Sequence, residues 1–277
     1  MSETSGSLRT DDGLTLHTQA WLPEGTAQAS VLIVHGYAEH IGRYGHVAAA
    51  LNAAGYAVYG LDHRGHGRSE GERVYIESVE RLSRDLGRYA EQVRAEAPER
   101  RLFVLAHSLG TLIALDWLLG TPGPVAGAIF SGTALDGDKT QPGFVLGIVK
   151  VLSKLLPHVR LVPAIASAQL STDESVVQAY DNDPLVDRGA WRIQSGYAGI
   201  AALAKLRGKL SGLTMPVLIL HGEDDVITPP SGATYLYEKS GAADKTLKTF
   251  PGMRHEILNE REKQVVLAEI QQWLSQH

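Results

Sequence analysis

Residues 101–115, Arg-Leu-Phe-Val-Leu-Ala-His-Ser-Leu-Gly-Thr-Leu-Ile-Ala-Leu, join a short apolar run to a helix-forming run through Ser108. Small residues flank this serine at Ala106 and Gly110, so a strand and a helix can pass closely at a tight turn. Such a turn exposes the hydroxyl, which is a poor nucleophile at neutral pH unless a base and backbone donors lie beside it. The stretch therefore predicts a nucleophile elbow, written A-x-S-x-G where G-x-S-x-G is usual.

A literal G-x-S-x-G also occurs in the chain, at residues 67–71. The apolar run before it, residues 56–61, ends several positions before Ser69, and no helix opens directly after the motif. A motif of this kind carries its chemistry only in a strand–turn–helix setting. We therefore interpret Ser69 as an ordered loop residue.

The hydrophobic pattern on both sides of the elbow predicts an α/β fold with an eight-stranded, mostly parallel sheet and helices on both faces. Asp12 and Gly13 mark a hairpin turn within residues 7–22, which places an antiparallel pair at one sheet edge. The remaining strands are expected at residues 31–34, 56–59, 102–105, 125–130, 217–220 and 246–250. A C-terminal helix is expected from about Glu260 to Trp273.

One insertion interrupts this alternation of strands and helices. Between the sixth and seventh strands lie about 80 residues without a strand pattern, which is too long for an ordinary loop. We expect residues 134–210 to form a helical cap, and residues 1–133 with 211–277 to form the core. Residues 144–156 carry two adjacent apolar rows, so a helix there needs a second packing partner. That partner could be an acyl chain, a membrane surface, another subunit or the cap's own core.

Composition excludes several classes of protein. The chain has 277 residues, of which 44% are hydrophobic, enough for a buried globular core. Its net charge of −5 without a basic run argues against a nucleic-acid partner. The absence of cysteine excludes disulfides and a thiol nucleophile. Neither a signal-peptide core nor an apolar run near the roughly 18 residues of a membrane span occurs, so we expect a cytoplasmic protein.

An acid and a histidine follow the late strands, at the sheet edge where the ends of parallel strands gather. Asp225 lies in His-Gly-Glu-Asp-Asp after the strand at 217–220, and His255 follows the strand at 246–250. With Ser108 they give the order Ser, Asp, His, which is the order of α/β-hydrolases. We expect His255 to act as the base and Asp225 to hold its imidazole. Asp224 is the competing acid, and an acid at 136 or 138 is a weaker alternative.

Acyl transfer also requires donors for the oxyanion. The amide of Leu109, directly after the nucleophile, and that of Tyr37, after the first parallel strand, match the usual positions.

The remaining histidines are given structural interpretations. His63 and His66 crowd one loop with Asp62, but zinc needs three or four converging ligands, so we expect loop hydrogen bonds, no metal and no cofactor. Strand alternation places His107 on the opposite side from Ser108.

Beyond the triad, three segments resemble the monoacylglycerol lipase family of serine hydrolases. They are His-Gly-Tyr-Ala-Glu-His-Ile-Gly-Arg-Tyr at 35–44, Asp-His-Arg-Gly-His-Gly-Arg-Ser-Glu-Gly at 62–71, and Asn-Asp-Pro-Leu at 182–185. The elbow and the segments 221–225 and 252–255 also match, and Ala106 in place of glycine is the departure. The likeness runs nearly end to end.

The resemblance implies hydrolysis of the single fatty acyl ester of a monoacylglycerol, with the acyl chain under the cap. It maps the glycerol end of the substrate onto Glu39, Arg43 and Tyr180. Val145 and Ile148, in the double apolar row, are candidates for the acyl side. Glu39 and Arg43, four residues apart, could pair if their turn is helical.

The implied partner is a small lipid substrate, and the wide apolar face of the cap makes peripheral membrane contact or a dimer an open alternative. A broader carboxylesterase or a lysophospholipase would use the same mechanism. A ligand-sensing protein and an acyltransferase with another acceptor are alternatives of other classes, because fold alone does not fix function.

Overall fold

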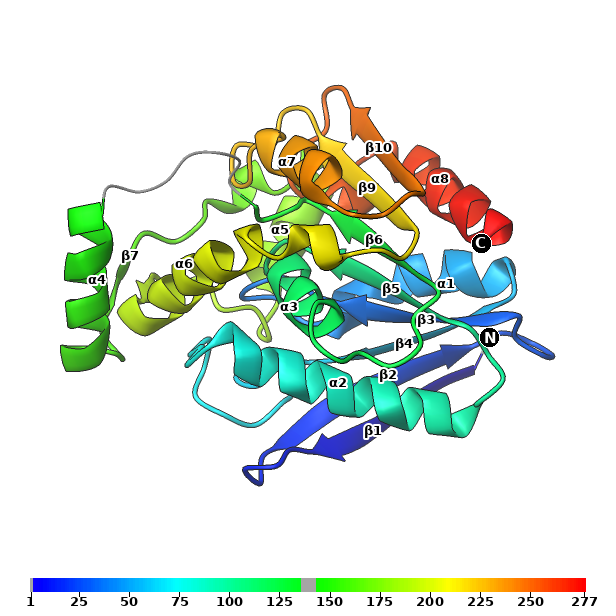
Figure 1. Ribbon diagram of the computed structural model, residues 1–277, viewed down its shortest axis with the longest axis horizontal. Coiled ribbons are helices and arrows are strands. Elements are labelled where there is room, and N and C mark those ends of the chain that lie inside the picture. Colours follow the sequence, from blue (N-terminus) through cyan, green and yellow to red (C-terminus); the bar gives the residue numbers. More distant parts are fainter. Residues whose placement is uncertain (1, 136–142) are drawn as a thin grey trace.

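A computed structural model describes residues 2–135 and 143–277. Within them, eight strands form one sheet in the order β1-β2-β4-β3-β5-β6-β9-β10 (Figure 1). The strands are β1 (Ser2–Arg9), β2 (Thr15–Leu22), β3 (Ala29–Val34), β4 (Tyr56–Leu61), β5 (Leu102–His107), β6 (Gly127–Ser131), β9 (Val217–Gly222) and β10 (Lys245–Phe250). β1 pairs with β2, and β2 with β4, in antiparallel register, while all other neighbours are parallel. The predicted α/β-hydrolase sheet and its edge hairpin are confirmed.

Helices cover both faces of the sheet because successive side chains of each strand point to opposite sides. In β5, Phe103 and Leu105 face one apolar cluster, and Val104 and Ala106 face the other. The first cluster is closed by α1 (Gly45–Ala53) and α8 (Lys263–Gln276), the second by α2 (Val79–Glu96), α3 (Leu109–Leu118) and α7 (Ser231–Lys239). The parallel strands are buried along their whole length, as a doubly covered sheet requires.

The C-terminal helix begins three residues later than expected, at Lys263. The cause is Glu260, whose buried carboxylate accepts hydrogen bonds from the amides of Thr172 and Arg254 and from the Ser171 hydroxyl. These contacts hold the chain in an extended conformation at Glu260, with φ −70° and ψ 167°. Glu260 thereby ties the end of the core to residues of the insertion.

The insertion between β6 and β9 contains three α-helices in its described part, α4 (Gly143–Leu155), α5 (Glu174–Asn182) and α6 (Ile193–Arg207). It also contains two short antiparallel strands, β7 (Arg160–Val162) and β8 (Trp191–Arg192), which the sequence analysis did not predict. Strands of three and two residues are too short to show an alternating pattern in the sequence.

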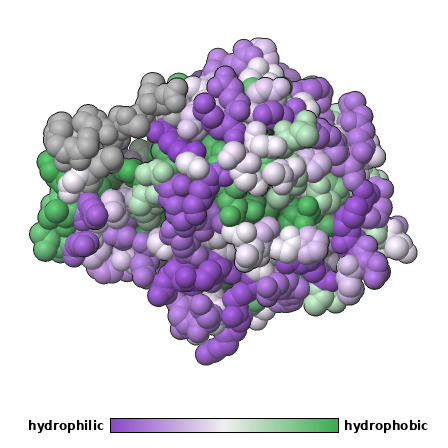
Figure 2. Space-filling view, in the orientation of Figure 1, coloured by the Kyte–Doolittle hydropathy of each residue, from purple (hydrophilic) through white to green (hydrophobic). Residues whose placement is uncertain are grey.

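The insertion extends from one side of the sheet, and α4 lies at its far end (Figure 1). Ile148, Val151 and Leu155 of α4 are more than half exposed, and hydrophobic residues gather at this end of the molecule (Figure 2). α6 packs closer in, because its Ala198 and Leu206 belong to the apolar cluster under α3. No helix in the described part of the chain is both long and apolar enough to span a membrane.

Candidate active site

Ser108 lies at the turn between β5 and α3 with φ 53° and ψ −123°, a conformation that side-chain-bearing residues seldom adopt. Close packing holds this turn. A Cβ at Gly110 would collide with the carbonyl oxygens of Val34 and His35, so only glycine fits there. Ala106 is fully buried between β3 and β6, and its methyl group is accommodated. The elbow thus keeps its strained geometry although alanine replaces the usual glycine.

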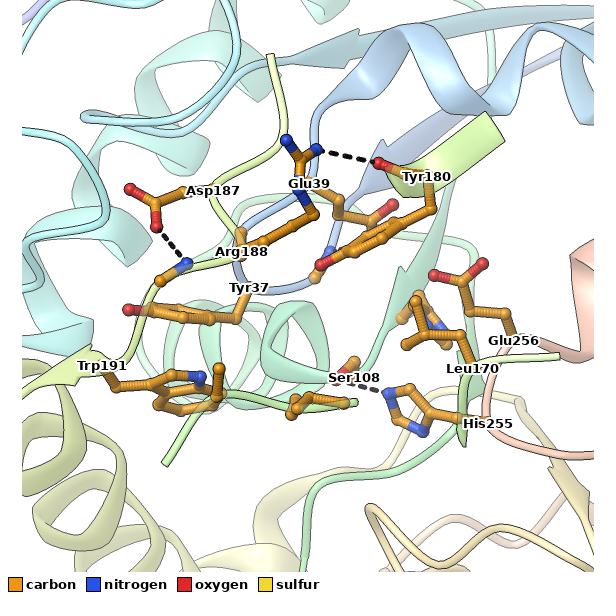
Figure 3. Close-up of a pocket in the computed structure, with 16 residues that line it drawn as sticks. Tyr37, Glu39, Ser108, Leu170, Tyr180, Asp187, Arg188, Trp191, His255 and Glu256 are labelled. Atoms are coloured by element: carbon orange, nitrogen blue, oxygen red, sulfur yellow. Dashed lines mark hydrogen bonds between the residues drawn. The ribbon is translucent and has the colours of Figure 1, made fainter. Parts of the chain in front are cut away.

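The structure brings Ser108, His255 and Asp225 together, and Figure 3 shows the contact between Ser108 and His255. His255 Nε2 lies 2.8 Å from Ser108 Oγ, and His255 Nδ1 lies 2.8 Å from Asp225 Oδ2. Asp224 is exposed and its amide donates to the Met253 carbonyl, so its side chain does not contact the imidazole. Positions 136 and 138 lie outside the described residues. The hydrogen-bonded chain therefore runs through Asp225.

Further donors surround the Asp225 carboxylate. The amides of Ile227 and Thr228 each donate to Oδ1 at 2.9 Å, and the Thr228 hydroxyl donates to Oδ2 at 2.8 Å. His221 Nε2 lies 3.1 Å from the same oxygen. Burial alone would raise the pKa of Asp225, but hydrogen bonds from His221 and His255 outweigh it and hold the pKa well below its usual range. The carboxylate is therefore ionised and able to stabilise an imidazolium at His255.

The backbone amides of Tyr37 and Leu109 lie near Ser108 and have no hydrogen-bond acceptor within the described part of the chain. Leu109 follows the serine directly at the start of α3. The loop before Tyr37 also lies against the serine, since a Cβ on Gly36 would be 3.1 Å from Ser108 Cβ. Both predicted oxyanion donors are thus close to the hydroxyl and unoccupied.

Arg43 connects three parts of the chain beside this pocket. It donates to Glu39 at 2.8 Å and makes two 2.7 Å hydrogen bonds to Glu256, the residue after His255. The Tyr180 ring from α5 lies 4.9 Å from its guanidinium carbon. Glu39 and Tyr180 line the pocket, whereas Arg43 lies behind them. The predicted Glu39–Arg43 pairing is confirmed, and Glu256 was missed by the sequence analysis.

The two acids that share Arg43 differ in their pKa. Burial raises the pKa of Glu39, which receives one hydrogen bond from Arg43 and lies near the like charge of Glu256. Burial also acts on Glu256, but the charge and the paired hydrogen bonds of Arg43 lower its pKa to about 2. Glu256 therefore carries the charge that neutralises the buried guanidinium.

We expect Glu256→Ala to lower the free energy of unfolding by about 3 kcal/mol, because Arg43 would lose its main counter-charge in a buried position. Urea unfolding of the purified protein measures this change. The matched control is Glu262→Ala, an exposed acid a few residues away, with an expected change within about 0.5 kcal/mol. Equal stability of the two variants would contradict the assigned importance of this ion pair.

The structure does not place Ile148, one of the two residues proposed for the acyl side, at the pocket. Ile148 is 55% exposed and does not line the pocket beside Ser108. The side chain of Val145 lies outside the described residues. The apolar lining from the insertion comes from Ala164, Ile165, Leu170 and Trp191 instead. Sequence periodicity identified an apolar helix but not the loop residues that contact the pocket.

The position expected for His107 was wrong. His107 is buried, lines the pocket, and its ring centroid lies 4.8 Å from that of His255. β5 ends at this residue, so strict strand alternation no longer fixes the direction of its side chain. His107 therefore belongs to the wall of the site.

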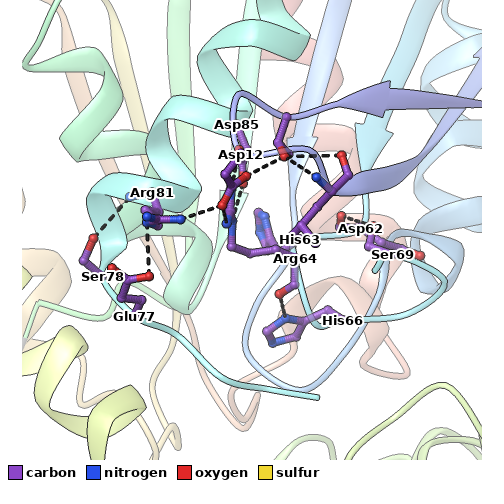
Figure 4. Close-up of polar contacts among 12 residues, drawn as sticks. Asp12, Asp62, His63, Arg64, His66, Ser69, Glu77, Ser78, Arg81 and Asp85 are labelled. Atoms are coloured by element: carbon purple, nitrogen blue, oxygen red, sulfur yellow. Dashed lines mark hydrogen bonds and ion pairs between the residues drawn. The ribbon is translucent and has the colours of Figure 1, made fainter. Parts of the chain in front are cut away.

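Residues 62–71 form an ordered loop (Figure 4), and none of them lines the pocket beside Ser108. The Ser69 hydroxyl donates to the Asp62 carbonyl and accepts from the His17 amide, as expected for a loop residue. Arg64 pairs with Asp85 and Asp12, which anchors the loop to α2 and to the edge hairpin. Among the described residues no three His, Asp or Glu side chains are arranged to hold a metal ion.

Buried histidines should make the protein less stable in mild acid. Burial lowers the pKa of His63 and His107 to about 3 and that of His66 to about 4. In the unfolded chain these groups titrate near 6.5. Between about pH 6.5 and 4 the unfolded state therefore binds protons that the folded state does not, and stability falls as pH falls.

We expect a loss of about 1–2 kcal/mol for each of these histidines between pH 7.5 and pH 5. Urea unfolding at the two pH values measures it. A free energy of unfolding that stays constant through this window would contradict the neutral, buried state of these side chains.

Comparisons with known proteins agree with this geometry. The family model described as "Serine aminopeptidase, S33" matches residues 25–262. The chain is 34% identical to a monoacylglycerol lipase of Mycolicibacterium smegmatis, covering 96% of this chain and 94% of the relative. It is also 34% identical to the monoglyceride lipase of Homo sapiens, covering 96% and 88%. Among solved structures, the monoacylglycerol lipase of Paleococcus ferrophilus superimposes with a TM-score of 0.81 at 32% identity, covering 94% and 98%.

Proposed function

The chain belongs to the monoacylglycerol lipases within the serine aminopeptidase S33 family, and on that premise we propose that it cleaves monoacylglycerols to glycerol and fatty acid through an acyl-enzyme at Ser108. It is a serine-type ester hydrolase. The observation that carries the proposal is the hydrogen-bonded chain from Ser108 through His255 to Asp225, with 2.8 Å at both contacts. The order of these residues along the chain and the unoccupied amides beside the serine support it.

In the first half of the reaction, His255 Nε2 takes the Ser108 proton while Oγ attacks the ester carbonyl carbon. The carbonyl oxygen becomes an oxyanion, which the amides of Tyr37 and Leu109 would bind. His255 then returns the proton to the glycerol oxygen as the carbon–oxygen bond breaks. Asp225, held ionised by its donors, stabilises the imidazolium in between.

In the second half, water replaces glycerol as the nucleophile. His255 removes a proton from the water, the hydroxide attacks the acyl carbon, and the proton passes to Ser108 Oγ as the acyl-enzyme bond breaks. The products are fatty acid and free enzyme. Each proton that His255 removes is returned within the same half, and one water is consumed for each ester cleaved.

The pocket combines polar and apolar side chains, as an ester of glycerol and a fatty acid requires (Figure 3). Glu39 and Tyr180 supply polar atoms to which glycerol hydroxyls would bind, and Arg43 contacts both residues. Apolar surface comes from residues of the insertion, including Leu170 and Ile165, which pack in one cluster with Tyr180. The volume of the pocket is about 30 Å³, room for only one or two waters. We therefore infer that residues 134–210 act as a cap that must move for the acyl chain to enter.

The test is fatty-acid release from monoacylglycerols of graded acyl length, with diacylglycerol and a short activated ester for comparison. We expect turnover of monoacylglycerols and little turnover of diacylglycerol. Hydrolysis of the short activated ester alone would replace the proposal with a general carboxylesterase. Transfer of the acyl group to added alcohols in preference to water would indicate an acyltransferase.

Monoacylglycerols reside in lipid phases, and the apolar residues of α4 and of the segment after it could contact such a lipid surface. Ile148, Val151, Leu155 and Leu161 are each more than half exposed. A lipid surface would bury this apolar area. We expect the protein to co-sediment with phosphatidylcholine vesicles, and Leu155→Ser with Leu161→Ser to reduce the bound fraction several-fold. If the double variant bound vesicles as well as the wild type, the result would contradict this membrane contact.

A further inference from the structure

The loop at residues 36–38 leaves the Tyr37 amide without a hydrogen-bond acceptor among the described residues. The Gly36 amide donates to Glu39 Oε1 at 2.7 Å, and the Ala38 carbonyl accepts from the Asp187 amide at 3.1 Å. The Gly36 carbonyl lies 2.8 Å from His35 Nδ1. This carbonyl and the Tyr37 amide belong to one peptide unit, whose C=O and N–H point in opposite directions. A contact that fixes the carbonyl therefore also fixes the direction of the Tyr37 N–H.

His35 is fully buried in a cluster with His63 and His66, with ring centroids 4.0 and 5.6 Å from its own. Burial first, and then the neighbouring histidines, hold the pKa of His35 well below its usual value, so the ring is neutral. Its Nε2 accepts the His63 amide at 3.0 Å, so that nitrogen carries no proton. The single proton of the ring must lie on Nδ1, where it is donated to the Gly36 carbonyl.

We propose that His35 is a positioning residue for ester hydrolysis, which fixes and polarises the Gly36–Tyr37 peptide so that its N–H binds the oxyanion. The inference rests on the proposed function. Hydrogen bonds in series strengthen one another in a buried site, so a donor on the carbonyl makes the amide of the same peptide a better donor. The benefit arises when charge develops on the substrate oxygen, in the transition state rather than in the bound ester.

The experiment compares His35→Ala with His66→Ala. Both remove a buried imidazole from the same cluster, but His66 Nδ1 donates to the Arg64 carbonyl and not to the oxyanion peptide. The His66 ring meets Tyr37 only at its side chain, with the ring centroids 5.7 Å apart. We expect His35→Ala to lower kcat by about tenfold or more with KM nearly unchanged. This decrease in kcat is smaller than the decrease expected when an oxyanion donor itself is removed. Its affinity for an alkyl boronic acid, which forms a tetrahedral adduct on the serine, should fall by a similar factor. His66→Ala should keep both quantities within about threefold of the wild type.

His35→Asn tests the assigned atom, because an asparagine amide can place a donor near the position of Nδ1. We expect it to recover most of the kcat lost in His35→Ala. Equal losses of kcat in the His35→Ala and His66→Ala variants, or no recovery of kcat in His35→Asn, would show that His35 has only a structural role. All three variants are also assayed on a short activated ester. If the wild type fails to hydrolyse monoacylglycerol, the proposed substrate is refuted, but the variants can still be compared on the short ester.

A second measurement is independent of activity. Two-dimensional ¹⁵N–¹H NMR of the wild-type protein at pH 7 reports which imidazole nitrogen carries the proton. We expect the His35 ring to be neutral and protonated at Nδ1. A ring protonated at Nε2 could not donate to the Gly36 carbonyl and would overturn the proposal.

Discussion

Ser108→Ala is expected to lower kcat for ester hydrolysis by at least about 10⁴-fold, because no other group can form the acyl-enzyme. The fold should survive, since alanine only removes the hydroxyl at the turn, and KM should change little. Initial rates of fatty-acid release measure the effect, with circular dichroism as the check on folding.

The matched control for this substitution is Ser69→Ala, which alters the literal G-x-S-x-G motif. The Ser69 hydroxyl makes two hydrogen bonds, one within its loop to Asp62 and one from the His17 amide of β2, so its loss should reduce stability modestly and leave kcat within about threefold. If activity instead persisted in Ser108→Ala and vanished in Ser69→Ala, the nucleophile would have been assigned to the wrong serine.

Asp225→Asn is expected to lower kcat by about 10⁴-fold, the second largest effect. Asparagine has nearly the same shape, but it removes the charge that stabilises the imidazolium and can hold His255 in the wrong tautomer. Four groups besides His255 donate to this carboxylate: the amides of Ile227 and Thr228, the Thr228 hydroxyl and His221 Nε2. The NH₂ group of asparagine would therefore face another donor. Steady-state kinetics at several pH values measure the loss.

Asp224→Asn is the control, because it makes the same chemical change one residue away on an exposed side chain. Its kcat should remain within about twofold of the wild type, as surface substitutions have small effects. A large loss in Asp224→Asn with little loss in Asp225→Asn would assign the acid to the other residue.

The sheet and the hydrogen-bonded chain of Ser108, His255 and Asp225 were predictable from the sequence because both depend on local patterns. Strands of a doubly covered sheet are short apolar runs, and Ser108, Asp225 and His255 follow such runs directly. Asp225 was preferred over Asp224 because it lies four residues after His221, in the spacing H-G-x-x-D. The 2.8 Å contact between Asp225 and His255 agrees with this choice.

Long-range side-chain contacts were not predictable in this way. Glu256 joins Arg43, 213 residues earlier in the chain, and no spacing in the sequence shows that the two loops meet. The proton position on His35 depends on the His63 amide, which only the folded loop brings to its ring. His107 was misplaced because strand alternation ends where the strand does.

The apolar helix of the insertion shows a different limit. Its two rows were recognised, but amphipathic spacing does not say which partner covers them, and Ile148 faces solvent rather than the pocket. Residues of irregular segments, including Ile165 and Leu170, line the site instead. Such segments have no period from which their contacts could be predicted.

The central claim is that Ser108 is the nucleophile of a monoacylglycerol hydrolase, and active-site labelling tests it most directly. An alkyl fluorophosphonate forms a phosphorus–oxygen bond with an activated serine and releases fluoride, and peptide mass mapping locates the adduct. We predict one adduct, on Ser108, whose rate of formation falls when a long-chain monoacylglycerol is present as a competing substrate. An adduct on another serine, or labelling of Ser108 that monoacylglycerol does not slow, would contradict the account.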